Sequence, residues 1–243
     1  MNIFALNSIM MNKYILTLLA ILSVSVSNAQ SSPSSMLSKS AYSMPSRDYV
    51  MIQFGYDNWT NHPDSIKVNG VGRAFNAYLC YDFPIMKSNF SFAAGLGIGT
   101  SSIFLKDQQI VLTDTSASIS FISETEPYKK YKLTTSYIEA PFEIRYFGNK
   151  ENRNKGVKIA LGLKVGTLLS SHTKGKRTFN NKPIIEKVST KRYVETWRYA
   201  TTARIGYGNF SVFGSYNLGG LFKANAGPEN VRPYSVGICV SGL

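Results

Sequence analysis

The chain has 243 residues, which suits one domain better than two. Aromatic residues make up 13% of the chain and charged residues only 17%, so it is rich in strand-forming side chains. Its formal net charge of +13 favours anionic partners. The mean hydropathy of -0.09 matches a soluble protein. It does not exclude a membrane barrel, because lipid-facing and interior-facing residues alternate there and average out.

The first 29 residues have the pattern of a secretory signal peptide, with a start-site extension at their beginning. Lys13 supplies a basic start, Ile15–Val26 is apolar, and Ser27-Asn28-Ala29 places small residues where signal peptidase reads them. The apolar run is shorter than the roughly 20 residues of a membrane-spanning helix. We therefore expect cleavage before Gln30 and export, which argues against a nucleic acid partner. Residues 30–46 lack periodicity and are predicted to be a flexible leader.

From Arg47 onward, apolar residues recur at every second position, which is the period of a β-strand. Each run has one apolar face and one small or polar face, and no helix is needed. The eight expected strands are Tyr49–Tyr56, Arg73–Asp82, Phe90–Phe104, Tyr131–Phe147, Val157–Ser171, Glu195–Tyr207, Phe210–Leu218 and Arg232–Val240.

The connections between these strands alternate between short and long. The short ones are Pro84–Asn89, Gly148–Lys155 and Gly208-Asn209, and the long ones are Trp59–Gly72, Leu105–Lys130, Thr173–Val194 and Gly219–Val231. Short turns on one side and long loops on the other are typical of outer-membrane barrels. The sequence therefore predicts an all-β, eight-stranded antiparallel up-and-down transmembrane β-barrel over residues 47–243. We expect it in the cell outer membrane of a Gram-negative bacterium, surrounded by outer-membrane lipid.

Aromatic residues gather near the strand ends, which favours a membrane barrel over a soluble sandwich because amphipathic rings prefer both membrane interfaces. Beside the short turns stand Tyr49, Tyr81, Phe83, Phe90, Tyr146, Phe147, Tyr207 and Phe210. Beside the long loops stand Trp59, Phe104, Tyr131, Trp197, Tyr199 and Phe222. Two aromatic belts are predicted.

Charged residues on the polar face predict an ion-pair network in the lumen, formed by Glu139, Glu143, Arg145, Lys158, Lys164 and Arg204. If Phe147 pairs with Gly156, Glu139 falls opposite Lys164 and Glu143 lies diagonal to Lys158. Acid/base catalysis by Glu139 and Glu143 is the alternative interpretation, but two carboxylates specify no reaction by themselves. A paired network filling a narrow barrel is the better interpretation.

Other candidate sites have weaker support in the sequence. His62 and His172 stand in long loops without a partner to orient them, and no zinc pattern occurs, so we expect neither catalytic residues nor a metal or other cofactor. Cys80 and Cys239 are predicted to be buried free thiols, because two strand spacings, roughly 9–10 Å, would separate them. Glycines 95, 97 and 99 are expected to leave room for long interior side chains.

The third long loop is the densest basic segment of the chain, with Lys174, Lys176, Arg177, Lys182, Lys187, Lys191 and Arg192. It is predicted to be external. Two interpretations stay open: the loop binds lipopolysaccharide phosphates or an acidic partner, or its charges only keep a solvated loop soluble.

Two segments resemble the PorT-like family of small outer-membrane β-barrels. They are Tyr137–Tyr146, reading YIEAPFEIRY, and Tyr234–Ile238, reading YSVGI. The resemblance implies an eight-stranded barrel. Because some members of that family are linked to type IX protein secretion, it also implies secretion-system proteins as partners. We expect a non-enzymatic structural or accessory role. The alternatives are an enzyme acting on lipid at the barrel rim and a soluble lipocalin-like binder with an apolar lumen.

Overall fold

The computed structural model describes residues 50–242 except 69, 87, 112–117, 124–127, 150, 154 and 180–181. The expected signal peptide, the leader and the boundary at residue 47 lie outside the described residues. The strands are β1 (Val50–Thr60), β2 (Gly72–Pro84), β3 (Phe90–Leu105), β4 (Gln108–Val111), β5 (Ser120–Ser123), β6 (Lys130–Phe147), β7 (Val157–Phe179), β8 (Lys182–Ser189), β9 (Trp197–Tyr207), β10 (Phe210–Asn217) and β11 (Arg232–Ser241). Over the same residues, no helix is both long and apolar enough to cross a membrane.

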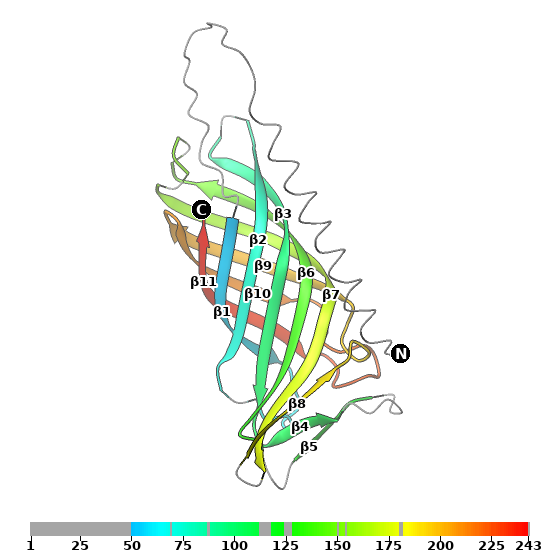
Figure 1. The fold of residues 1–243 in the computed structure, drawn as a ribbon. Helices are drawn as coiled ribbons and strands as arrows, with labels where there is room; N and C mark the ends of the chain where they lie inside the picture. Colours follow the sequence, from blue (N-terminus) through cyan, green and yellow to red (C-terminus); the bar gives the residue numbers. More distant parts are fainter. Residues whose placement is uncertain are drawn as a thin grey trace, which may run out of the picture. The chain divides into compact units, whose positions relative to one another are not determined.

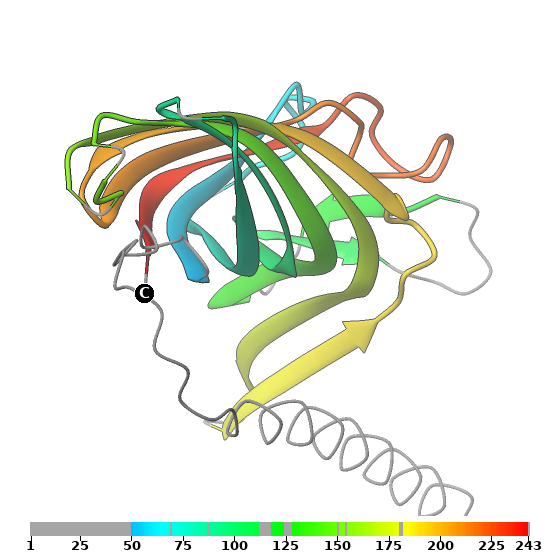
Figure 2. The same ribbon diagram turned by 90° about the horizontal axis from the view of Figure 1, so that it is seen from above.

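In the part of the chain that the structure describes, eight strands form a closed antiparallel ring (Figures 1 and 2). The order around the ring is β1, β2, β3, β6, β7, β9, β10 and β11. Pairing of β11 with β1 and of β6 with β7 completes the closure. Every expected strand corresponds to one strand of this ring, so the predicted eight-stranded barrel is confirmed.

The β9–β10 hairpin shows how the sequence directs one of the short turns. Tyr207 pairs with Phe210, which leaves Gly208 and Asn209 as a two-residue turn. Gly208 has a φ of 62°, a left-handed value that suits glycine at the first position of a type II′ hairpin turn. These two residues are sufficient to connect the neighbouring antiparallel strands β9 and β10.

The barrel wall is apolar outside and polar inside. Leu79, Leu161 and Ile205 are exposed on the exterior at 69%, 63% and 60%, whereas Glu139 and Asp82 in the interior are exposed at 1% and 0%. A soluble barrel would place these faces the other way round, because exposed apolar side chains are unfavourable in water. The arrangement therefore rules out the lipocalin-like alternative.

Two connections that the sequence predicted as loops contain strands. β4 and β5 form a small hairpin between β3 and β6, and β7 continues past the barrel to pair with β8. Figure 1 shows both hairpins at the end of the barrel opposite the short turns. The expected third loop was wrong for a physical reason: residues 172–179 are mostly polar, so the alternation of apolar side chains that marks a half-buried strand is missing there.

The same end of the barrel holds a hydrophobic cluster, here called the mouth cluster. It contains Trp59, Ile66, Ile103, Leu105, Ile110, Ile119, Tyr131, Leu133, Tyr137, Leu168, Tyr193, Val194, Leu221, Phe222, Ala226 and Val231. Trp59, Tyr131 and Phe222 were expected in an aromatic belt, and that expectation was wrong. Their side chains point inward and pack on other apolar groups, with the rings of Trp59 and Phe222 6.1 Å apart.

Parts of the two predicted belts do face outward. Tyr81, Phe83, Phe90, Tyr207 and Phe210 are exposed near the short turns, and Trp197 and Tyr199 are exposed near the long connections. Phe147 is a further correction, because it is 2% exposed and lies inside. Tyr49 lies outside the described residues.

Candidate functional site

The barrel interior near the short turns is organised around Glu143. Its Oε2 lies 2.8 Å from Arg145 Nε and 2.7 Å from Arg204 Nη2. Arg145 Nη1 in turn lies 2.9 Å from Asp82 Oδ1, and Arg153 Nη1 lies 3.4 Å from Asp82 Oδ2. All five side chains are buried. Each carboxylate therefore meets at least two cations, as charges removed from water require.

A second group of charges lies around Glu139, further from the short turns. Lys164 Nζ is 3.3 Å from Glu139 Oε2, and Arg198 Nη1 is 3.2 Å from Glu139 Oε1. The Tyr78 hydroxyl donates a 2.5 Å hydrogen bond to Glu139 Oε2. Arg198 Nε donates to Asn217 Oδ1 at 2.9 Å. Tyr78 is on β2 and Arg198 on β9, strands on opposite sides of the ring, so the network crosses the lumen.

The predicted membership of this network was largely right, but the predicted register was wrong. Phe147 pairs with Lys158 rather than Gly156, which puts Glu139 opposite Gly166. Shifting the pairing by two residues keeps every side chain on its face, because the side-chain period is two. Glu139 therefore still meets Lys164, now along the diagonal. The expected diagonal between Glu143 and Lys158 was wrong, because Glu143 pairs with Gly162, four residues from Lys158. The Lys158 Nζ lies 5.7 Å from the centre of the Phe147 ring.

The sequence interpretation missed several members of the network. Asp82 and Arg198 stand at interior positions of strands that were correctly placed. The alternation along each strand was therefore sufficient to predict that their side chains face the lumen. Asp57, a buried residue whose carboxylate accepts a hydrogen bond from the Ser235 hydroxyl, was missed because the first expected strand ended at Tyr56, whereas β1 continues to Thr60. Arg153 comes from the β6–β7 connection, where no periodicity indicates the direction of a side chain.

Glycines provide the space that the long interior side chains occupy. A Cβ added at Gly99 would lie 2.5 Å from Glu139 Oε2, and one at Gly162 would lie 2.8 Å from Glu143 Cγ. Real Cβ atoms do not come this close to other heavy atoms. The predicted role of the alternating glycines on β3 is therefore confirmed at Gly99.

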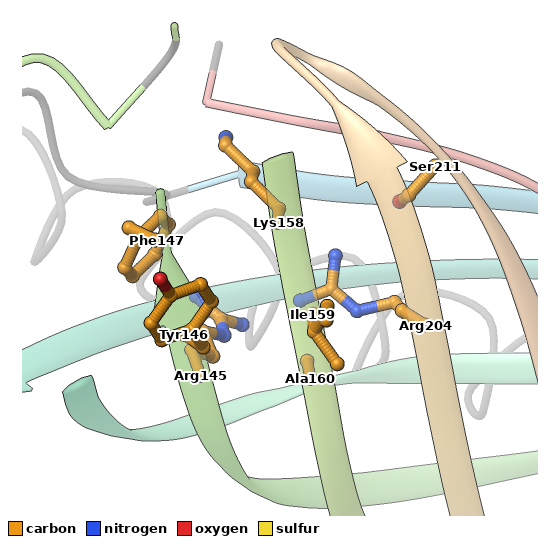
Figure 3. A pocket seen from close by; sticks show the side chains of 8 residues that line it. All are labelled: Arg145, Tyr146, Phe147, Lys158, Ile159, Ala160, Arg204 and Ser211. Atoms are coloured by element: carbon orange, nitrogen blue, oxygen red, sulfur yellow. The ribbon is translucent and has the colours of Figure 1, made fainter. Parts of the chain in front are cut away.

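Little space is left beside the Glu143 group. A cavity of about 10 Å³ is lined by Arg145, Phe147, Lys158, Arg204 and Ser211, among others. That volume holds about one water molecule. Figure 3 shows the guanidinium groups of Arg145 and Arg204 reaching toward each other from strands on either side of β7. Paired side chains, rather than a water-filled passage, occupy this part of the barrel.

The remaining candidate residues do not form a reactive centre with one another. Cys80 and Cys239 are buried free thiols packed with Met51, Tyr78 and Phe213. Among the described residues, no group of three or more His, Cys, Asp or Glu is placed to hold a metal ion. His62 lies in the connection after β1, with its Nδ1 3.2 Å from the Pro63 carbonyl oxygen. His172 lies on β7, paired with Thr134 and Ser189.

The predicted basic loop is mostly a strand hairpin, which divides its charges between two faces. Lys174, Lys176 and Lys187 are exposed on the outer face. Arg177 is on the other face, where its Nη2 lies 2.5 Å from Glu186 Oε1. The remaining members occupy other positions, with Lys182 beginning β8 and Lys191 and Arg192 lying between β8 and β9.

Comparison with known families agrees with this geometry. Residues 28–224 match the family described as outer membrane protein beta-barrel domain. The chain belongs to this family. The match covers most of the chain and ends before β11, the strand that closes the ring on β1. No curated protein and no solved structure matched the chain. Like the family, the chain is an integral outer-membrane barrel, so its apolar exterior faces lipid.

Proposed function

We propose that the protein is a closed, non-enzymatic barrel that serves as a structural or accessory component of the outer membrane or of protein secretion. The supporting observation is the buried network that runs from Tyr78 and Asp82 on β2 to Arg198 and Arg204 on β9. Eight strands enclose an interior just wide enough for side chains. With the mouth cluster at one end and paired charges along the lumen, such a barrel acts through its surfaces rather than as a diffusion pore.

Ion conductance across a bilayer tests directly whether the barrel is closed to ions. The full-length mature protein is reconstituted in planar bilayers beside a porin as positive control. We expect no stepwise currents from the barrel, because ions would have to displace buried pairs whose partners cost several kcal/mol to leave unpaired. Reproducible single-channel steps from purified protein would contradict the closed state.

The secretion role has support only from the resemblance at Tyr137–Tyr146 and Tyr234–Ile238. In the first segment, Glu139, Glu143 and Arg145 point into the lumen network, so these residues serve the architecture. A gene deletion separates the two roles. Loss of secreted proteins with an intact permeability barrier would indicate a secretion accessory, and a leaky barrier with normal secretion would indicate a structural role. A strain normal in both respects would refute both.

The enzyme alternative would need a nucleophile, a base and an orienting group at the rim. His172 and Ser189 are register partners on the outward face of the β7–β8 hairpin. The described strand residues around them on that face include Lys174 and Lys187 but no carboxylate. We therefore favour the non-enzymatic role. Time-dependent deacylation of lipid by the purified barrel, abolished in His172→Ala, would overturn it.

A further inference from the structure

A row of three lysines crosses the outward face of the sheet beyond the barrel. Lys132 on β6 pairs with Lys174 on β7, and Lys174 pairs with Lys187 on β8. We call these three residues the lysine row. Directly paired side chains on one face have Cβ atoms about 5 Å apart. Lys174 and Lys187 are exposed and Lys132 is half-buried.

A β-bulge creates this row. Tyr137 pairs with Leu168 and Ser136 with Ser170, so Leu169 is an extra residue on β7. One extra residue reverses which face each later side chain occupies. Before the bulge, even-numbered side chains of β7 such as Lys164 point into the lumen. After it, Lys174 points outward instead and joins Lys132, which lies on the lipid-facing side of β6.

The row is electrostatically unfavourable when nothing is bound to it, because like charges directly opposite each other destabilise a sheet. Among the described strand residues on this face, none is Asp or Glu, and Glu186 lies on the opposite face with Arg177. Partial burial and then the nearby charges of Lys174 and Arg73 lower the pKa of Lys132. An anion bound across these strand positions would offset the repulsion between the lysines.

A groove adjoins the row. It has a volume of about 320 Å³ and is lined in part by Arg73, Phe104, Lys129 and Lys130. Phe104 is the register partner of Lys132, so groove and row are continuous. The Arg73 guanidinium lies 6.0 Å from the centre of the Phe104 ring. An anionic group bound at the row therefore has a concave, partly apolar surface next to it.

The position of the row along the barrel indicates what lies against it. On β6, the ten residue-to-residue steps from Tyr146 to Ser136 span roughly 33 Å along the strand. At the usual tilt this is about 25 Å of height, which is the thickness of the apolar band of such barrels. Lys132 is four residues further, about 10 Å beyond the band by the same measures. Lysine side chains can reach back several ångströms toward the interface.

We propose that the lysine row, with Arg73 and the adjoining groove, binds the phosphate groups of phosphorylated lipid headgroups in the outer leaflet around the barrel. The row lies on the same outward face as the lipid-facing side chains of β6, at the height of headgroups rather than of free solvent. Three cations suit a headgroup that carries more than one phosphate. This lipid contact does not depend on whether the barrel takes part in secretion.

The test uses the full-length mature protein in detergent micelles and purified lipopolysaccharide as probe. The triple variant K132S/K174S/K187S is compared with K67S/K191S/K223S, which removes the same charge from connections outside the row. We expect the row variant to bind about 100-fold more weakly at low salt, from roughly a factor of five per lysine. The control should change less than threefold, and added salt should narrow the difference.

Three further arms identify the ligand. Dephosphorylated lipopolysaccharide should bind wild type as weakly as intact lipopolysaccharide binds the row variant. Equal loss of affinity in both triple variants would overturn the site and indicate an effect of net charge alone. Inorganic phosphate or an acidic peptide that binds the row as tightly as lipopolysaccharide would overturn the lipid as ligand. Unfolding of both variants in urea is measured in parallel, and removal of like charges should not destabilise the row variant.

Discussion

Glu143→Gln is the sharpest perturbation of the lumen network. Glutamine has nearly the same size but carries no charge and has one acceptor oxygen instead of two. The carboxylate that it replaces has its Oε2 2.8 Å from Arg145 Nε and 2.7 Å from Arg204 Nη2. Both arginines are buried, at 2% and 6% exposed, so water cannot readily solvate the unpaired charge. Breaking a buried pair of this kind costs about 3–5 kcal/mol, and we expect the unfolding free energy to fall by that amount.

The assay is urea unfolding of the barrel in lipid vesicles, followed by tryptophan fluorescence and by the gel mobility of the folded form. Glu229→Gln, at an exposed position, is the matched control and should change stability by no more than about 0.5 kcal/mol. In the double variant E143Q/R204M the two losses should not add, with a coupling of about 0.5–3 kcal/mol. A loss below about 1 kcal/mol in Glu143→Gln, or strict additivity, would refute the reasoning.

Three other outcomes are expected. Gly99→Ala should destabilise the barrel by about 1–3 kcal/mol, because its methyl group would meet a buried carboxylate oxygen at 2.5 Å, whereas Gly219→Ala, with open space around it, should have little effect. The chain has two tryptophans. Brominated lipid should quench the fluorescence of W59F, which retains the outward Trp197, and should not quench that of W197F, which retains the buried Trp59. Equal quenching of the two variants would contradict the assigned faces. Burial and then nearby lysines lower the pKa of His172 below 6.5; the unfolded chain therefore binds this proton more strongly, and wild type should lose stability as pH falls below 6.5 by more than His172→Gln does.

Much of the wall was predictable because the signal is local. Alternation of apolar and polar residues identified all eight strands and the face of most wall side chains, so Glu139, Glu143, Lys164 and Arg204 were expected inside before any partner was known. Alternation would also have placed Phe147 inside, but its position beside a short turn led to the belt prediction, which was wrong. Period two is a property of each strand by itself, which is why it could be read without tertiary information.

By itself, the sequence determined which residues form the barrel wall and which of them line the lumen. Only the tertiary structure decided the β6–β7 register, the burial of Trp59 and Tyr131 in the mouth cluster, and the bulge at Leu169 that turns Lys174 outward. These features depend on closing the ring and on packing the long connections together. A register shift of two residues leaves the alternation of faces unchanged, so local periodicity cannot reveal it. A single extra residue reverses the alternation, so periodicity assigns the residues after a bulge to the wrong face.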